Sequence, residues 1–162
     1  MKLRLDFVTN SSSSSFILGF RDKEDGIRQI ASLMLTEDHN AVVELMLDFV
    51  NADPMTPEEL VQEVDDDFYL PYNISENARK KWFANHPEYK YPKDVDVWWD
   101  SDEYKSLLQS EKKKEQKRLM DAVSKYPYLV RLEYCDHTDV GYELEHEILP
   151  DADFTVDWES HH

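Results

Sequence analysis

The hydrophobic pattern of this chain changes its period along the sequence, and that change limits the folds open to it. Towards the C-terminus, in Tyr128–Cys135 and Phe154–Trp158, apolar or aromatic residues occupy every second position, which is the period of a strand. In the middle, as in Asp22–Leu35, apolar residues recur every three or four positions, which predicts amphipathic helices. We therefore predict an α+β fold, one domain over residues 1–162. Its single antiparallel sheet is built from N- and C-terminal strands and covered by about five helices from the middle of the chain.

Local signals refine this expectation. Leu3–Val8 and Ser15–Phe20 are predicted strands, so the serines before Phe16 should lead directly into the sheet. The segment Glu37–Asn51 is apolar nearly all round, which predicts the most buried helix. Thr56 and Glu59 form a capping box that starts another helix. The pattern of Tyr142–Leu149 fits either a strand or a short helix.

The formal net charge of −17 narrows the classes of partner. A charge this negative argues against direct binding to nucleic acid or to an anionic membrane, because both are polyanions. It remains compatible with simple solubility, with cation binding and with a basic protein partner. The charge is also uneven, because no lysine or arginine occurs from Gln29 to Ala78.

The compartment expected from the sequence is the cytoplasm. Cys135 is the single cysteine, so the chain forms no internal disulfide, as is usual in a reducing compartment. The sequence contains no apolar stretch of the ~20 residues that a membrane helix needs, and its first residues do not have the pattern of a signal peptide.

The opening segment is distinctive. Asp6-Phe7-Val8-Thr9-Asn10 is followed by five serines, Ser11–Ser15, and then by Phe16-Ile17. This string resembles the start of an uncharacterised family of proteins encoded in Firmicutes-type bacteria and their phages. Gly141, Leu144–Leu149 and Ser160–His162 are similar to the end of that family. The resemblance implies a cytosolic protein that mobile elements can carry, and it implies no activity, cofactor or catalytic residue.

The C-terminal stretch gathers side chains that bind metals. Four of the six histidines fall there, together with several carboxylates, and imidazole and carboxylate are ligands of zinc and manganese. Adjacent strands could bring the histidines together, although no known zinc spacing is matched. Histidines that merely offset the negative charge at the surface would give the same pattern. The predicted ligands are His137, His146, His161, His162, Glu143 and Glu145.

Two further patterns have competing interpretations. Residues 136–147 match a calcium loop at four positions, Asp136, Thr138, Gly141 and Glu147. Val140 does not match, because it stands at the fifth position, which requires a side-chain ligand. The segment 85–99 combines two prolines with large aromatic residues and is expected to be an extended connection, ending in a short strand at Val95–Trp99. Its aromatic residues could form a binding platform, or they could pin the connection onto the core, which we favour.

Two functional hypotheses follow. The first is a non-enzymatic binding or interaction module, related to phages or mobile elements, that holds a basic partner through its acidic surface or through the aromatic connection. An acidic mimic of nucleic acid is one version of it. The alternative is a metal-dependent enzyme, resembling a hydrolase, that uses the C-terminal histidines and carboxylates with a divalent metal such as zinc or manganese.

Overall fold

The computed structural model describes residues 6–7, 13–66, 68, 70–135 and 137–161. The chain divides into two compact units. The sheet unit comprises Met1–Leu60 and Leu119–His162, and the helical unit comprises Val61–Arg118. The single domain over residues 1–162 stays a prediction.

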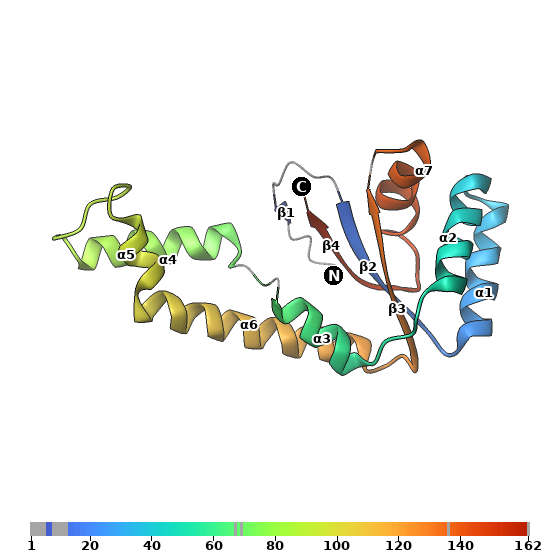
Figure 1. Cartoon of the computed structure of the whole chain (residues 1–162), viewed down its shortest axis with the longest axis horizontal. Coiled ribbons are helices and arrows are strands. Elements are labelled where there is room, and N and C mark those ends of the chain that lie inside the picture. The colour runs from blue at the N-terminus through green and yellow to red at the C-terminus, as the bar shows by residue number, and fades with distance from the viewer. Residues whose placement is uncertain (1–5, 8–12, 67, 69, 136, 162) are drawn as a thin grey trace. The chain divides into compact units, whose positions relative to one another are not determined.

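One sheet organises the sheet unit. Its strands are β1 (Asp6–Phe7), β2 (Ser13–Phe20), β3 (Tyr128–Cys135) and β4 (Thr155–His161), in the order β1-β4-β2-β3 (Figure 1). The central strand β2 pairs antiparallel with both β3 and β4, while the short β1 runs parallel to β4. The predicted α+β class, with N- and C-terminal strands in one sheet, is confirmed. The rest of the predicted strand Leu3–Val8 lies outside the described residues.

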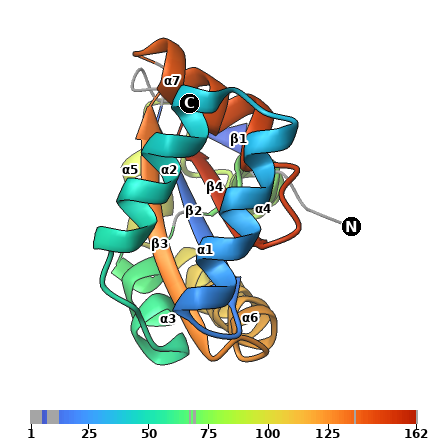
Figure 2. The ribbon, with the colours of Figure 1, turned by 90° about the vertical axis from the view of Figure 1, so that its right-hand side faces the viewer.

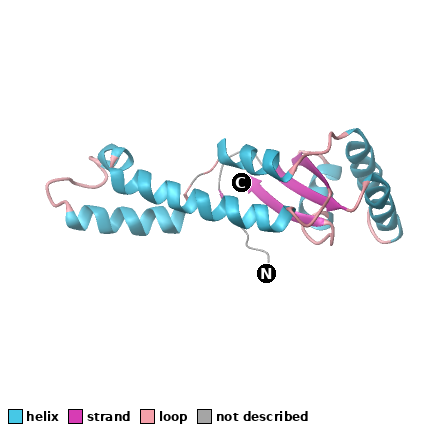
Figure 3. Cartoon of the chain, turned by 90° about the horizontal axis from the view of Figure 1, so that it is seen from below, coloured by secondary structure: helices cyan, strands magenta, loops and turns pink. Residues whose placement is uncertain are grey.

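Helices occupy most of the chain between β2 and β3, and a further helical segment follows β3 (Figure 3). A 3₁₀ turn at Leu33–Leu35 follows α1, and a π-helix at Glu143–Ile148 follows α7. The α-helices are α1 (Lys23–Ser32), α2 (His39–Asn51), α3 (Pro57–Asp66), α4 (Tyr72–Asn85), α5 (Val95–Asp100), α6 (Asp102–Val123) and α7 (Asp139–Tyr142).

The main core lies on one face of the sheet, where α1 and α2 pack side by side over the strands (Figure 2). Phe16, Leu18 and Phe20 alternate along β2 and so point to this face. Phe20 makes an edge-to-face contact with Phe49 of α2, with ring centroids 5.0 Å apart. The intervening residue Ile17 points to the opposite face and is also buried. The central strand is therefore buried on both faces.

The local structure decides three of the predictions made for single segments. The capping box is confirmed, since Thr56 Oγ1 accepts from Glu59 N at 3.2 Å and Glu59 Oε2 accepts from Thr56 N at 2.8 Å. Residues 142–148 are helical, which settles the choice left open by their pattern. The short strand predicted at Val95–Trp99 is wrong, because this segment forms helix α5.

The prediction that Glu37–Asn51 forms the most buried helix agrees with the structure, because α2 has four buried residues and no other described helix has more than three. One side of α2, including Ala41, Leu45 and Phe49, is buried against the sheet as expected. The other side keeps apolar residues at the surface, with Leu47 58% exposed. Because α2 covers a single face of one sheet, it has only one neighbour layer and cannot bury its whole circumference.

Aromatic side chains dominate the helical unit, in which every described regular element is a helix. Trp82 and Trp98 are buried with ring centroids 5.9 Å apart. Tyr89 stacks on Trp82 at 5.5 Å, and the guanidinium of Arg79 lies 4.4 Å from the centre of the Tyr91 ring. These contacts favour the interpretation that the aromatic residues pin the connection between α4 and α5 onto a local core.

No helix in the described part of the chain meets the length and hydropathy that a membrane span requires.

Candidate functional site

The serine motif and the C-terminal segment meet at one end of the sheet. In the register of the strands, Ser13 of β2 lies opposite Cys135 of β3 on one side and opposite His161 of β4 on the other. Ser11 and Ser12 lie outside the described residues, but Ser13–Ser15 belong to β2 itself. The two ends of the chain that carry the family resemblance are therefore neighbours, and these serines are strand residues rather than a linker.

A buried hydrogen bond links these two ends. Ser14 is fully buried, and its Oγ donates to Oε1 of Glu145 at 2.6 Å. Glu145 belongs to the π-helix and is 1% exposed. The widened turn of a π-helix often occurs at functional positions, and here it turns a carboxylate towards the sheet. A buried carboxylate needs such a partner, because burial without hydrogen bonds is costly.

The next serine makes a second polar contact on the opposite face of the strand. Ser15 Oγ accepts from Nη2 of Arg131 and donates to Oε1 of Glu133, both at 3.1 Å. Arg131 and Glu133 also form an ion pair at 3.2 Å. Ser14 and Ser15 therefore make polar contacts on opposite faces of β2, because successive side chains of a strand alternate between its two faces.

The structure does not bring the predicted metal ligands together in the part of the chain that it describes. No group of three or more histidine, cysteine, aspartate or glutamate side chains there could hold a metal ion. His137 is exposed, Glu143 and His146 are half-buried, and the His146 ring packs on Tyr142 with centroids 4.6 Å apart. Glu145 is instead buried against Ser14.

Two of the predicted ligands lie outside what the structure describes, so the metal site stays a prediction. The backbone of His161 is placed in β4, but its side chain and all of His162 are not described. The calcium-loop interpretation is wrong, because residues 139–148 form helical turns and not a liganding loop.

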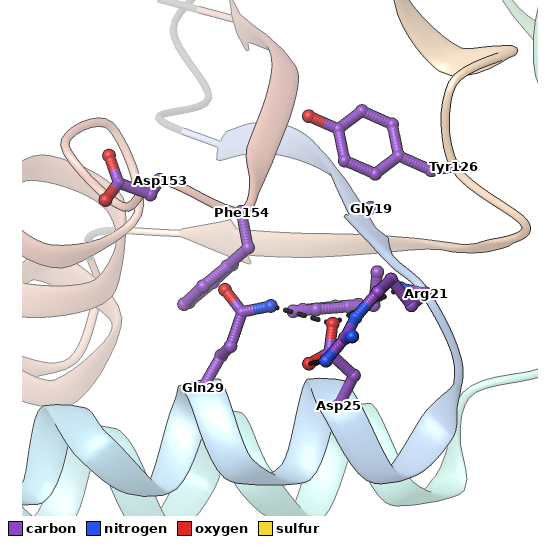
Figure 4. A pocket seen from close by; sticks show the side chains of 8 residues that line it. Gly19, Arg21, Asp25, Gln29, Tyr126, Asp153 and Phe154 are labelled. Atoms are coloured by element: carbon purple, nitrogen blue, oxygen red, sulfur yellow. Dashed lines mark hydrogen bonds and ion pairs between the residues drawn. The ribbon is translucent and has the colours of Figure 1, made fainter.

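A cavity of about 330 Å³ lies elsewhere in the sheet unit, between the end of β2, the start of α1 and the segment before β4 (Figure 4). Gly19 forms part of its wall, and a Cβ atom there would lie 2.6 Å from the Tyr126 ring, so only glycine fits. Its lining residues are Gly19, Phe20, Arg21, Asp25, Gln29, Tyr126, Asp153 and Phe154.

Asp25 is the polar centre of this cavity. It is buried, and its Oδ1 accepts from Nη2 of Arg21 at 2.8 Å, while Oδ2 accepts from Nε2 of Gln29 at 3.0 Å. Arg28 adds a longer ion pair at 3.2 Å. The hydrogen bond from Arg21 holds the pKa of the Asp25 carboxyl well below its usual range, against the opposing effect of burial.

The chemistry of the cavity is that of hydrogen bonding. None of its eight lining residues, all of them described, is serine, threonine, cysteine, histidine or lysine. The carboxylate of Asp25 already accepts from several donors, and this network ties the end of β2 to α1. Sequence reasoning missed this group because its members come from four separate segments. Local signals were present at Asp22, whose Oδ1 caps α1 by accepting from Asp25 N at 2.7 Å, and in the four-residue spacing of Arg21, Asp25 and Gln29.

Comparison with known proteins gives no assignment, since no family model, curated protein or solved structure matches this chain. The resemblance carried by the serine motif therefore stays a prediction.

Replacing Ser14 with alanine should destabilise the fold by about 1–3 kcal/mol, because Glu145 loses a donor that water cannot replace in a buried site. Urea unfolding measures the loss. Ser13→Ala, next to it on the same strand and only half-buried, is the matched control and should change the free energy of unfolding by less. Equal effects of the two substitutions would contradict the buried link.

Replacing Asp25 with asparagine should lower the thermal midpoint at neutral pH, because the variant loses the ion pair with Arg21. The pKa of Asp25 is depressed in the folded state, so its stabilisation is present above the unfolded pKa of about 3.9 and declines as the pH falls towards the folded value. The difference in midpoint between native and variant chains should therefore narrow below about pH 4. Glu24→Gln, exposed on the same helix, is the control, and a pH-independent difference for Asp25→Asn would contradict the assignment.

Proposed function

We propose that this chain is a cytoplasmic, non-enzymatic binding module that holds a basic protein partner through the acidic surface of its sheet unit. The observation that carries the proposal is how the charge divides between the two units. The sheet unit has 22 aspartates and glutamates against 7 lysines and arginines, a formal charge of −15. The helical unit has 13 against 11, a formal charge of −2.

Solubility alone does not account for this division. A soluble protein needs net charge, but concentrating that charge on one unit increases its self-repulsion and opposes compaction. A surface that attracts a cationic partner does require such concentration, because it then steers the partner to one place. The segregation therefore supports recognition over simple solubility.

The electrostatic surroundings of two tyrosines show where carboxylates of the sheet unit gather. Burial raises the pKa of Tyr134, and the nearby carboxylates Asp48 and Glu44 raise it further. Burial likewise raises the pKa of Tyr128, with further contributions from Asp53 and Glu24. Carboxylates from α1, α2 and the segment after α2 thus act together on the face of the sheet unit where α2 packs.

The alternative, a metal-dependent enzyme resembling a hydrolase, lacks a comparable observation. Catalytic zinc sites use three protein ligands, and the described residues contain no such group.

Charge reversal at matched positions tests the proposal. The probe is an unstructured lysine-rich peptide, titrated against the full chain at low and at physiological salt. Glu37→Lys, Glu44→Lys and Asp53→Lys together should weaken binding about tenfold or more, because they remove carboxylates from the sheet unit. The control variant carries Glu88→Lys, Asp96→Lys and Glu103→Lys in the helical unit, which changes the net charge by the same amount.

The native chain should bind the peptide at low salt and lose affinity steeply as salt is added. Equal weakening by the two triple variants would show that only total charge matters, and absence of binding at low salt would refute the proposal. Circular dichroism of both variants checks that the fold is kept.

A further inference from the structure

The outer side of the helical pair α1–α2 carries an unusual concentration of exposed apolar side chains. Val43, Leu47 and Val50 are 42%, 58% and 40% exposed. Their spacing of four and three residues places them in one row along α2. Leu35, in the turn between the two helices, is 88% exposed, and Ile27 on α1 is 37% exposed. We call these five residues the outer apolar row.

Chance scatter does not explain the outer apolar row. Single exposed apolar residues are normal on protein surfaces, whereas grouped ones mark interaction sites. Among the described residues, five of the eleven exposed large apolar side chains belong to this helical pair. A helix that covers one face of a sheet ordinarily places polar residues on its outer side. Here α2 is apolar on the outer side as well.

The packing of the pair fixes the outer apolar row in place. A Cβ atom on Gly26 of α1 would overlap the ring of Phe49, so the two helices are in close contact there. At one end of the pair, Lys23 Nζ donates to the carbonyl of Val50 at 2.7 Å. The row is therefore presented by a rigid pair of helices that is anchored to the core by Phe49.

Carboxylates outnumber cations around the outer apolar row. Glu37, Asp38 and Glu44 accompany it on α2 and in the turn before it, and no lysine or arginine occurs from Gln29 to Ala78. Three cations lie on or beside α1, where Lys23 bonds the Val50 carbonyl and Arg21 and Arg28 pair with Asp25. An apolar row with an acidic border complements a ligand that is apolar on one side and basic beside it.

From this we infer that the outer side of α1–α2 is a docking site for a basic amphipathic helix of a partner protein. The inference rests on the proposed function and gives it a location and a class of partner. From Val43 to Val50 the row is about 10 Å long, which matches two turns of a partner helix. A second copy of this chain fits poorly, because two sheet units of charge −15 would repel each other.

Two synthetic peptides and two variants test the inference. One peptide is an 18-residue helix with leucine on one side and lysine on the other. The second has the same composition in an order that gives no apolar side. The variant Val43→Gln with Leu47→Gln removes the centre of the outer apolar row but keeps the charge and a good helix former. The control is Val97→Gln on α5, where the valine is 37% exposed.

We expect the amphipathic peptide to bind the native full-length chain more tightly than the scrambled peptide. The double variant should weaken its binding about tenfold or more, and Val97→Gln should leave it unchanged. Circular dichroism and thermal unfolding confirm that both variants fold. If both peptides bind equally and neither variant matters, the docking site is refuted while recognition by charge survives. If neither peptide binds at low salt, the proposed function itself fails.

Light scattering of the native chain tests the other possible occupant of the site, which is a second copy of the chain. A concentration-dependent dimer that Val43→Gln with Leu47→Gln abolishes would overturn the inference in favour of self-association. A monomer at all concentrations tested would support the partner helix.

Discussion

The position of β2 between β3 and β4 is the constraint on which the sheet unit depends. Both edges of its backbone are paired and both of its faces are buried, so each side chain must pack or find a polar partner. Phe16 and its apolar neighbours pack against the core. Ser14 is held by Glu145, and Ser15 by Arg131 and Glu133. The serines are thus the polar end of a core strand, and they connect it to the π-helix.

The sequence allowed the fold class to be predicted because periodicity reports burial directly. The alternation in Tyr128–Cys135 and the helical spacing in Asp22–Leu35 both reflect which side faces the core. Prediction failed where packing against other elements, and not the local pattern, determines the structure of a segment. Val95–Trp99 is rich in strand-forming residues, yet Trp98 packs on Trp82 as part of helix α5. The outer apolar residues of α2 stay exposed, because the sequence shows apolar character but not how many layers are available to cover it.

The candidate sites illustrate the same limit. Histidines and carboxylates cluster in the C-terminal sequence, but neighbours in sequence on a helix point in different directions, and Glu145 turns inward while Glu147 stays at the surface. The cavity around Asp25 could not be found this way, since its walls come from distant segments. What the sequence did show was the absence of cations from Gln29 to Ala78, and the structure places Val43, Leu47 and Val50 of that segment on the outer side of α2.

Hydrogen exchange of the full chain, with and without the amphipathic lysine–leucine peptide, tests the central claim most directly. The account predicts that slowed exchange on binding is concentrated in α1 and α2, residues 23–51, with little change in α4, α5 and the part of α6 in the helical unit. Slowed exchange centred on residues 72–118, or spread evenly over both units, would contradict it.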